Sequence, residues 1–78
     1  MTNDEALSMI RSALDKVSPG AGEKVSMDTH LVEDDVLDSL DVMNFLFELE
    51  QEKGGQIEGI DESFEDFRVS RIVELMAA

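Results

Sequence analysis

Apolar residues recur at helical spacing in three separate stretches of this chain, and proline or glycine follows the first two. In the first stretch the apolar residues stand three or four positions apart: Leu7, Ile10, Leu14 and Val17. This spacing places them on one face of an α-helix. Asn3 or Asp4 can cap its start, and residues 18–22, which include Pro19, end it. The first stretch therefore predicts an amphipathic helix.

Two further helices and one short turn complete the predicted elements. The second helix runs from about Ser39 to Lys53 and ends at Gly54 and Gly55. The last runs from about residue 70 to residue 77, with these apolar residues on one face: Val69, Ile72, Val73 and Met76. A short helical turn is expected near residues 61–66. The sequence thus predicts an all-α fold, a small four-helix bundle of three longer helices and one short one, in a single domain spanning residues 1–78.

A long connection, from about Pro19 to Asp38, joins the first two helices. It carries isolated apolar residues: Val25, Met27, Leu31, Val32, Val36 and Leu37. Connections of this length are uncommon unless they are functional or packed on the core. We expect these apolar side chains to pin the connection to the helices.

The length and the charge exclude several classes of protein. A chain of 78 residues buries only about 60–65% of its unfolded surface, which leaves no room for a deep substrate pocket. We therefore expect a protein that is not an enzyme. Nineteen acidic residues stand against six basic ones, and the net charge of −13 excludes binding to nucleic acid or to anionic lipid. Such a surface instead attracts basic protein partners.

The acids are concentrated in one part of the chain. Residues 25–52 contain no lysine or arginine and nine acids: Asp28, Glu33, Asp34, Asp35, Asp38, Asp41, Glu48, Glu50 and Glu52. Two interpretations are open for this segment, a solvated face that keeps the protein in solution and a docking surface.

The absence of cysteine removes disulfides, cysteine-based metal sites and a thiol nucleophile from the chain itself. The first residues, Met1 to Glu5, are acidic, whereas a signal peptide begins with basic residues and an apolar run. No apolar run approaches the roughly 20 residues that span a bilayer. We expect a monomeric cytoplasmic protein that does not insert into membranes.

The second predicted helix has two apolar stripes. At about 100° per residue, one stripe faces the core: Val42, Phe45, Leu46 and Leu49. Leu40, Met43 and Phe47 fall on a separate stripe, which a central helix could bury but a domain this small cannot easily cover. We expect this second stripe to be partly exposed. An apolar strip bordered by carboxylates suits a partner helix, because apolar contact gives affinity and charge gives steering.

Asp38-Ser39-Leu40-Asp41 stands where the connection enters the second helix. A hydroxyl here would be exposed at the positive end of the helix dipole, which favours a phosphate. The simpler interpretation is a helix cap, because serine and aspartate are common at helix starts.

The wider segment, residues 31–42 (LVEDDVLDSLDV), resembles the phosphopantetheine attachment segment of the acyl carrier and peptidyl carrier protein family. In that family an Asp-Ser-Leu or Asp-Ser-Met motif opens the second helix. The resemblance covers nearly the whole chain, because the order of helices, the long connection, the length and the acidity agree with it as well.

The resemblance implies that Ser39 receives 4′-phosphopantetheine from coenzyme A through a phosphopantetheinyl transferase. The arm would carry an acyl or aminoacyl group as a thioester to acyl-loading, condensing and acyltransferase enzymes of fatty-acid, polyketide or related biosynthesis. We assign contacts with the basic docking patches of these enzymes to six residues: Asp38, Leu40, Asp41, Met43, Phe47 and Glu48. No metal ligands are assigned, and the cargo is not encoded in the sequence.

Two features depart from the family pattern. Asp35 occupies the expected glycine position, and aspartate tolerates a positive φ better than most residues. The segment from Phe67 to Val73 is about one residue shorter than usual. Together with a loop spacing closer to D-alanyl and peptidyl carriers, these departures suggest a specialised stand-alone carrier.

Two other kinds of site fit these residues poorly, and one other function fits them well. A serine hydrolase would need Ser39 and His30 aligned with an acid, but His30 is the single histidine and no nucleophile-elbow motif is present. We expect His30 to pack or hydrogen-bond locally in its loop. A calcium loop starting at Asp34 lacks the required ligands and glycine. The remaining rival is an unmodified acidic helical adaptor that binds a basic protein, which explains the charge and the second stripe equally well.

Overall fold

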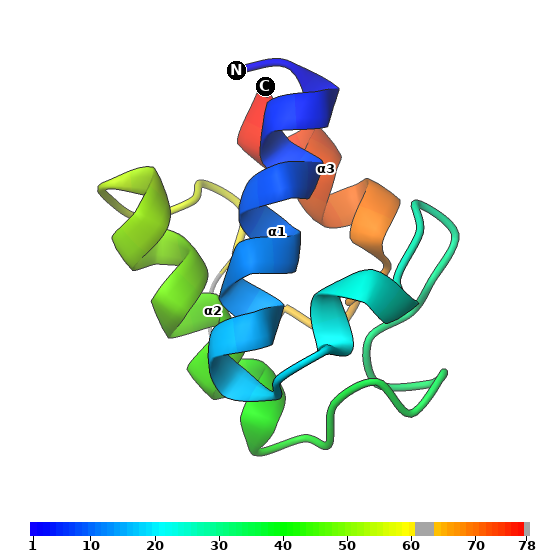
Figure 1. Ribbon diagram of the computed structural model, residues 1–78. Coiled ribbons are helices and arrows are strands. Elements are labelled where there is room, and N and C mark those ends of the chain that lie inside the picture. The colour runs from blue at the N-terminus through cyan, green and yellow to red at the C-terminus, as the bar shows by residue number, and fades with distance from the viewer. Residues whose placement is uncertain (61–63, 78) are drawn as a thin grey trace.

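The computed structural model describes residues 1–60 and 64–77. Within them the chain forms α1 (Asn3–Val17), the 3₁₀ helix η1 (Ala21–Lys24), α2 (Asp41–Lys53) and α3 (Val69–Ala77). Figure 1 shows α1 at the centre of the molecule, with α2 and α3 on either side of it. The described part contains no β-strand, only a single antiparallel bridge between His30 and Arg68.

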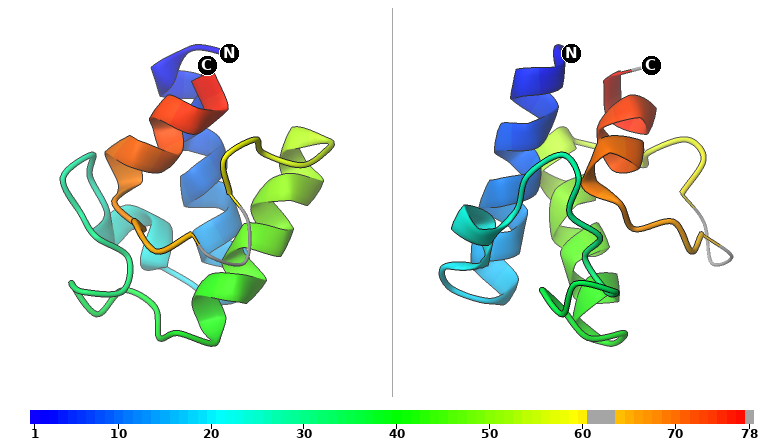
Figure 2. Two further views of the ribbon diagram at one scale, coloured as in Figure 1. Left: turned by 180° about the vertical axis from the view of Figure 1, so that it is seen from behind. Right: turned by 90° about the vertical axis from the view of Figure 1, so that its right-hand side faces the viewer.

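Helix α1 is the common partner of the other elements and packs against α2, η1 and α3. In both views of Figure 2 the N-terminus and the end of α3 lie at the same end of the molecule. The largest fully buried side chains come from all three helices and from the long connection: Ile10, Leu14, Leu31, Phe45, Leu49, Val69, Ile72 and Val73. One continuous core therefore joins the helices and the connection.

The residue that caps α1 is Thr2, which directly precedes the predicted caps Asn3 and Asp4. Thr2 Oγ1 accepts a hydrogen bond from Glu5 N at 3.1 Å, and Glu5 Oε1 accepts one from Thr2 N at 3.3 Å. This reciprocal pair satisfies two backbone N–H groups at the helix start. The prediction of Asn3 or Asp4 as the cap was wrong, because both belong to the first turn of the helix.

The long connection is pinned to the core as predicted. Val25, Leu31 and Leu37 are buried, and Met27, Val32 and Val36 are partly buried against the core. The connection also contains η1, which the sequence analysis did not anticipate. Gly22 lies so close to α1 that its N–H donates to Asp15 Oδ1 at 2.8 Å.

The predicted four-helix bundle is not confirmed. The described residues form three α-helices, and η1 is a lone 3₁₀ turn. Part of the predicted fourth element, residues 61–63, lies outside the described residues, and residues 64–66 are not helical. Among the helices that the structure describes, none has the length and apolarity needed to cross a membrane. The fold shown is a small, mostly helical domain.

Candidate functional site at the start of helix α2

Asp38 holds the backbone where the long connection turns into α2. Its Oδ1 accepts hydrogen bonds from the backbone N–H of Leu40 at 3.0 Å and of Asp41 at 2.7 Å. Its carbonyl oxygen accepts the first helical bond, from Val42 N at 3.0 Å. Helix α2 begins at Asp41, two residues after the predicted start, and its first turn is held by this carboxylate.

Ser39 lies directly after this cap and is exposed, as predicted. Its hydroxyl makes no hydrogen bond to any residue that the structure describes. The helix-cap interpretation is therefore confirmed for Asp38 and is wrong for Ser39. The Ser39 hydroxyl is thus presented to solvent at the positive end of α2.

Three large apolar side chains on α2 and its preceding turn face solvent. The exposed fractions are 78% for Leu40, 52% for Met43 and 60% for Phe47. The opposite face of the helix is buried, as predicted from the spacing: Val42, Phe45, Leu46 and Leu49. The prediction that the second stripe is exposed is confirmed, and we call Leu40, Met43 and Phe47 the α2 strip.

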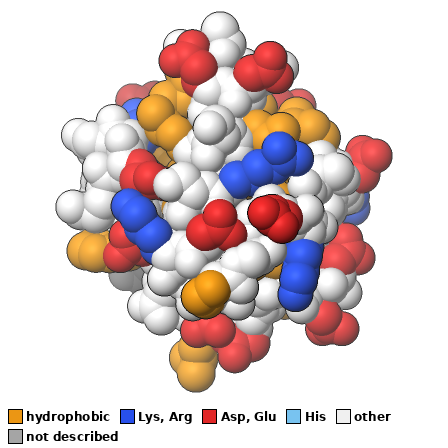
Figure 3. All heavy atoms as spheres, in the orientation of Figure 1, with side chains coloured by type: hydrophobic (Ala, Val, Ile, Leu, Met, Phe, Trp, Pro, Cys, Tyr) orange, Lys and Arg blue, Asp and Glu red, His pale blue; other side chains and the backbone are white. Residues whose placement is uncertain are grey.

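Carboxylates border the α2 strip. Asp38 is exposed, and Asp41 and Glu48 are partly buried on one side of the helix, with Glu50 on the other. In Figure 3 hydrophobic and acidic side chains lie together at the lower edge, where α2 begins in Figure 1. Of the six residues to which partner contacts were assigned, Asp38 directly precedes Ser39 and the other five lie at the start of α2 or along it.

Glu52 does not belong to this acidic border. Its Oε1 accepts a hydrogen bond from Ser12 Oγ at 2.7 Å and lies 3.5 Å from Lys16 Nζ. Both partners are on α1. This carboxylate therefore links α2 to α1, although the sequence analysis grouped it with the other acids.

The turn before Ser39 has the backbone conformation that was expected. Asp35 has a φ of 57°, the left-handed region in which glycine is most easily accommodated. Two residues later, Leu37 N donates to Leu31 O at 2.9 Å and closes the turn. The loop keeps this shape with aspartate in place of glycine.

His30 takes part in local hydrogen bonds, as predicted. Its Nδ1 accepts from Val32 N at 3.3 Å and from Glu33 N at 3.1 Å. A ring nitrogen that accepts two backbone bonds is not free to act as a base for Ser39. No cluster of three metal-binding side chains occurs in residues 1–60 and 64–77.

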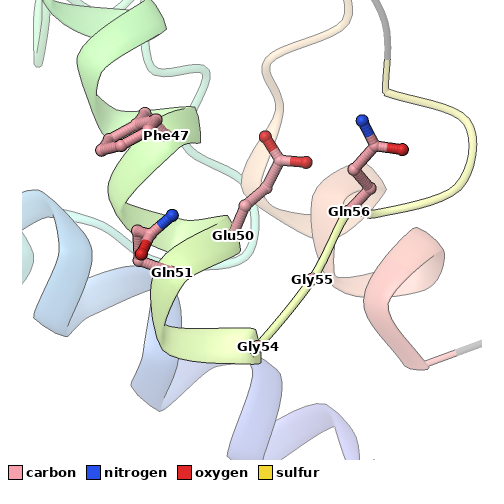
Figure 4. A pocket seen from close by; sticks show the side chains of 6 residues that line it. All are labelled: Phe47, Glu50, Gln51, Gly54, Gly55 and Gln56. Carbon is pink, nitrogen blue, oxygen red and sulfur yellow. The ribbon is translucent and has the colours of Figure 1, made fainter.

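A shallow hollow lies at the other end of α2. It has a volume of about 400 Å³ and is lined by Phe47, Glu50, Gln51, Gly54, Gly55 and Gln56. Figure 4 shows Glu50 and Gln56 on either side of it, one on the helix and the other on the connection that follows. The hollow extends the α2 strip beyond Phe47. No sequence pattern predicts it, because its wall depends on how the chain turns after Gly55.

Comparison of the chain with protein-family models, curated proteins and solved structures finds no match.

Proposed function

We propose that this chain is a carrier protein that holds an acyl or aminoacyl group on a 4′-phosphopantetheine arm attached to Ser39. The observation that carries the proposal is the exposed Ser39 hydroxyl, which has no described hydrogen-bond partner and stands between the Asp38 cap and the α2 strip. The resemblance of residues 31–42 to the attachment segment of carrier proteins supports the same assignment.

The attachment is a phosphoryl-group transfer. Ser39 Oγ would attack the phosphorus of coenzyme A that bears pantetheine, and a new phosphodiester bond would form. The bond from that phosphorus to the bridging oxygen of the pyrophosphate would break and release adenosine 3′,5′-bisphosphate. The hydroxyl proton would pass to a base of the transferase. The transferase would supply both this base and the binding site for coenzyme A, so Ser39 needs no activating base within the chain.

The arm would supply the thiol that the chain lacks, since the sequence contains no cysteine. A thioester on a flexible arm can enter the active sites of other enzymes, which a small domain without a deep pocket cannot provide itself. The acids around Ser39 would steer basic docking patches, and the α2 strip would supply the apolar contact. The partners of this scheme are a phosphopantetheinyl transferase and loading, condensing and acyltransferase enzymes of the cytoplasm.

Intact-mass measurement tests the proposal. The purified chain is incubated with coenzyme A, Mg²⁺ and a broad-specificity phosphopantetheinyl transferase. The expected result is one added phosphopantetheine on the wild type and none on Ser39→Ala. Ser8→Ala is the matched control, because Ser8 is also exposed, and it should be modified like the wild type.

The adaptor alternative gives the opposite result. An unmodified wild type, with both the broad-specificity enzyme and the transferase native to the same cell, would refute the carrier proposal. Binding of a basic helix to the unmodified α2 strip would then support the adaptor.

A further inference from the structure

His30 caps the turn that precedes Ser39. Its Nδ1 accepts from the backbone N–H of Val32 and Glu33 at 3.3 and 3.1 Å, while Asp34 Oδ2 accepts from His30 N at 2.9 Å. Asp34 N also donates to His30 O at 3.0 Å. The side chain of each residue therefore accepts a hydrogen bond from backbone at or near the other residue. The arrangement resembles the capping box at a helix start, but it encloses a turn of residues 31–35.

These bonds fix the proton on one ring nitrogen. A nitrogen that accepts hydrogen bonds carries no proton, so Nδ1 is the unprotonated atom and Nε2 carries the hydrogen. Nε2 lies 3.9 Å from Glu33 Oε2. The side chain is only 12% exposed, which keeps water from replacing Nδ1 easily.

The capped turn is connected to Ser39 through the backbone. Leu37 N donates to Leu31 O at 2.9 Å, and both leucines are buried in the core. On the other side, Leu31 N donates to Phe67 O at 2.9 Å and Val69 N donates to Thr29 O at 2.8 Å. The turn is thus anchored to the start of α3, and its last residues lead directly into Asp38 and Ser39.

We infer that His30 is a positioning residue for the modification of Ser39, an inference that rests on the function proposed above. Its acceptor nitrogen holds the turn that fixes where the serine enters α2. Protonation of Nδ1 turns the acceptor into a donor, so the amides of Val32 and Glu33 lose their partner together. Modification of Ser39 should therefore slow as His30 becomes protonated.

Among the described residues, charged groups lie near His30 on its own turn and on the segment across the bridge. Glu33 and Asp34 lie on the turn itself, and Arg68 lies across the bridge, where its Nη1 donates to Asp28 O at 2.8 Å. Asp66 Oδ1 accepts from Arg68 N at 3.4 Å on the same segment. Glu33 offers an ion pair to a protonated ring, but it cannot restore an acceptor for the two amides.

Two substitutions separate capping from titration. His30→Asn keeps an acceptor of similar reach that does not titrate between pH 5 and pH 8, and His30→Ala removes the acceptor. Loss of a cap typically shifts an equilibrium about fivefold. We expect the transferase rate on His30→Ala to fall about fivefold, and the rate on His30→Asn to stay within about twofold of wild type. Glu33→Gln is the control that keeps the cap and removes only the neighbouring charge.

The pH dependence of the modification rate distinguishes a positioning role of His30 from a merely structural one. The ratio of the wild-type rate to the His30→Asn rate cancels the transferase's own pH dependence, and it should fall as the pH is lowered far enough to protonate the imidazole. In ¹⁵N-resolved NMR of the unmodified wild type, the amide signals of Val32 and Glu33 should move together with the titration of the imidazole.

The outcomes separate this role from the proposed function. Amide signals of Val32 and Glu33 that ignore the imidazole titration would overturn the capping assignment, whether or not Ser39 is modified. A wild type that is modified at the same rate as a folded His30→Ala variant would overturn only the positioning role. A wild type that is never modified would overturn the proposed function and this role with it.

Discussion

Replacing Asp38 tests how the start of α2 is held. In Asp38→Ala the backbone N–H groups of Leu40 and Asp41 lose a shared carboxylate oxygen at 3.0 and 2.7 Å. Loss of a helix cap of this kind costs about 1 kcal/mol, within a range of roughly 0.5–2 kcal/mol. For a domain of this size that corresponds to a fall in Tm of about 4–8 °C. Asp38→Asn keeps an equivalent acceptor and should lie within a few tenths of a kcal/mol of wild type.

Thermal and urea unfolding followed by circular dichroism at matched ionic strength measure both variants. Asp38→Ala and Asp38→Asn each remove one negative charge, so their difference in unfolding free energy isolates the hydrogen bonds from the general repulsion. Equal stabilities for the two variants would refute the capping argument. Because Oδ1 accepts both bonds, Oδ2 stays available to a basic partner, and Asp38→Asn should weaken recognition by a transferase without weakening the fold.

Three further predictions follow from particular contacts. Asp35→Gly should raise the unfolding free energy by about 0.5–1 kcal/mol, because φ is 57° there. Asp35→Asn removes the same charge and should raise the unfolding free energy less. The reverse order in urea titrations would contradict the backbone explanation. Gly22→Ala should cost about 1–3 kcal/mol, because a Cβ would clash with the Arg11 carbonyl oxygen, whereas Gly55→Ala meets nothing within 4 Å and should be neutral. Salt should raise Tm, because the screening length falls from about 30 Å at 0.01 M to about 8 Å at 0.15 M, below the molecular dimensions of 27 × 26 × 21 Å; a Tm that does not change would show that the charges are compensated locally.

Helical periodicity predicted the division of α2 into two faces because side-chain direction follows directly from position along a helix. Val42 and Leu49 are buried and Leu40 and Phe47 are exposed, as the angles require. The positive φ at Asp35 was predicted for a similar reason, since it depends on a local backbone conformation. Such features need no knowledge of which distant segments meet.

The features that the sequence analysis missed depend on contacts between segments or on competition between neighbouring groups. The helix η1 follows a left-handed Gly20 and lies against Asp15 of α1, which no periodicity over four residues can reveal. Thr2 was passed over because Asn3 and Asp4 are equally good caps in isolation; its partner Glu5, three residues later, was the available signal. The role of Glu52 depends on Ser12, 40 residues away.

The internal bonds of several acids change how the charged surface should be understood. Asp34 and Asp38 each accept backbone N–H groups, and Glu52 is bound to α1, so these carboxylates hold the fold as well as adding charge. What remains for a partner is the α2 strip of three side chains with its acidic border. Stable interfaces bury roughly 800 Å² on each partner and involve about 20–30 residues a side, far more than this strip offers. If the strip and its border are the whole docking surface, encounters would be brief and steered by charge, as the proposed carrier would need in order to visit several enzymes.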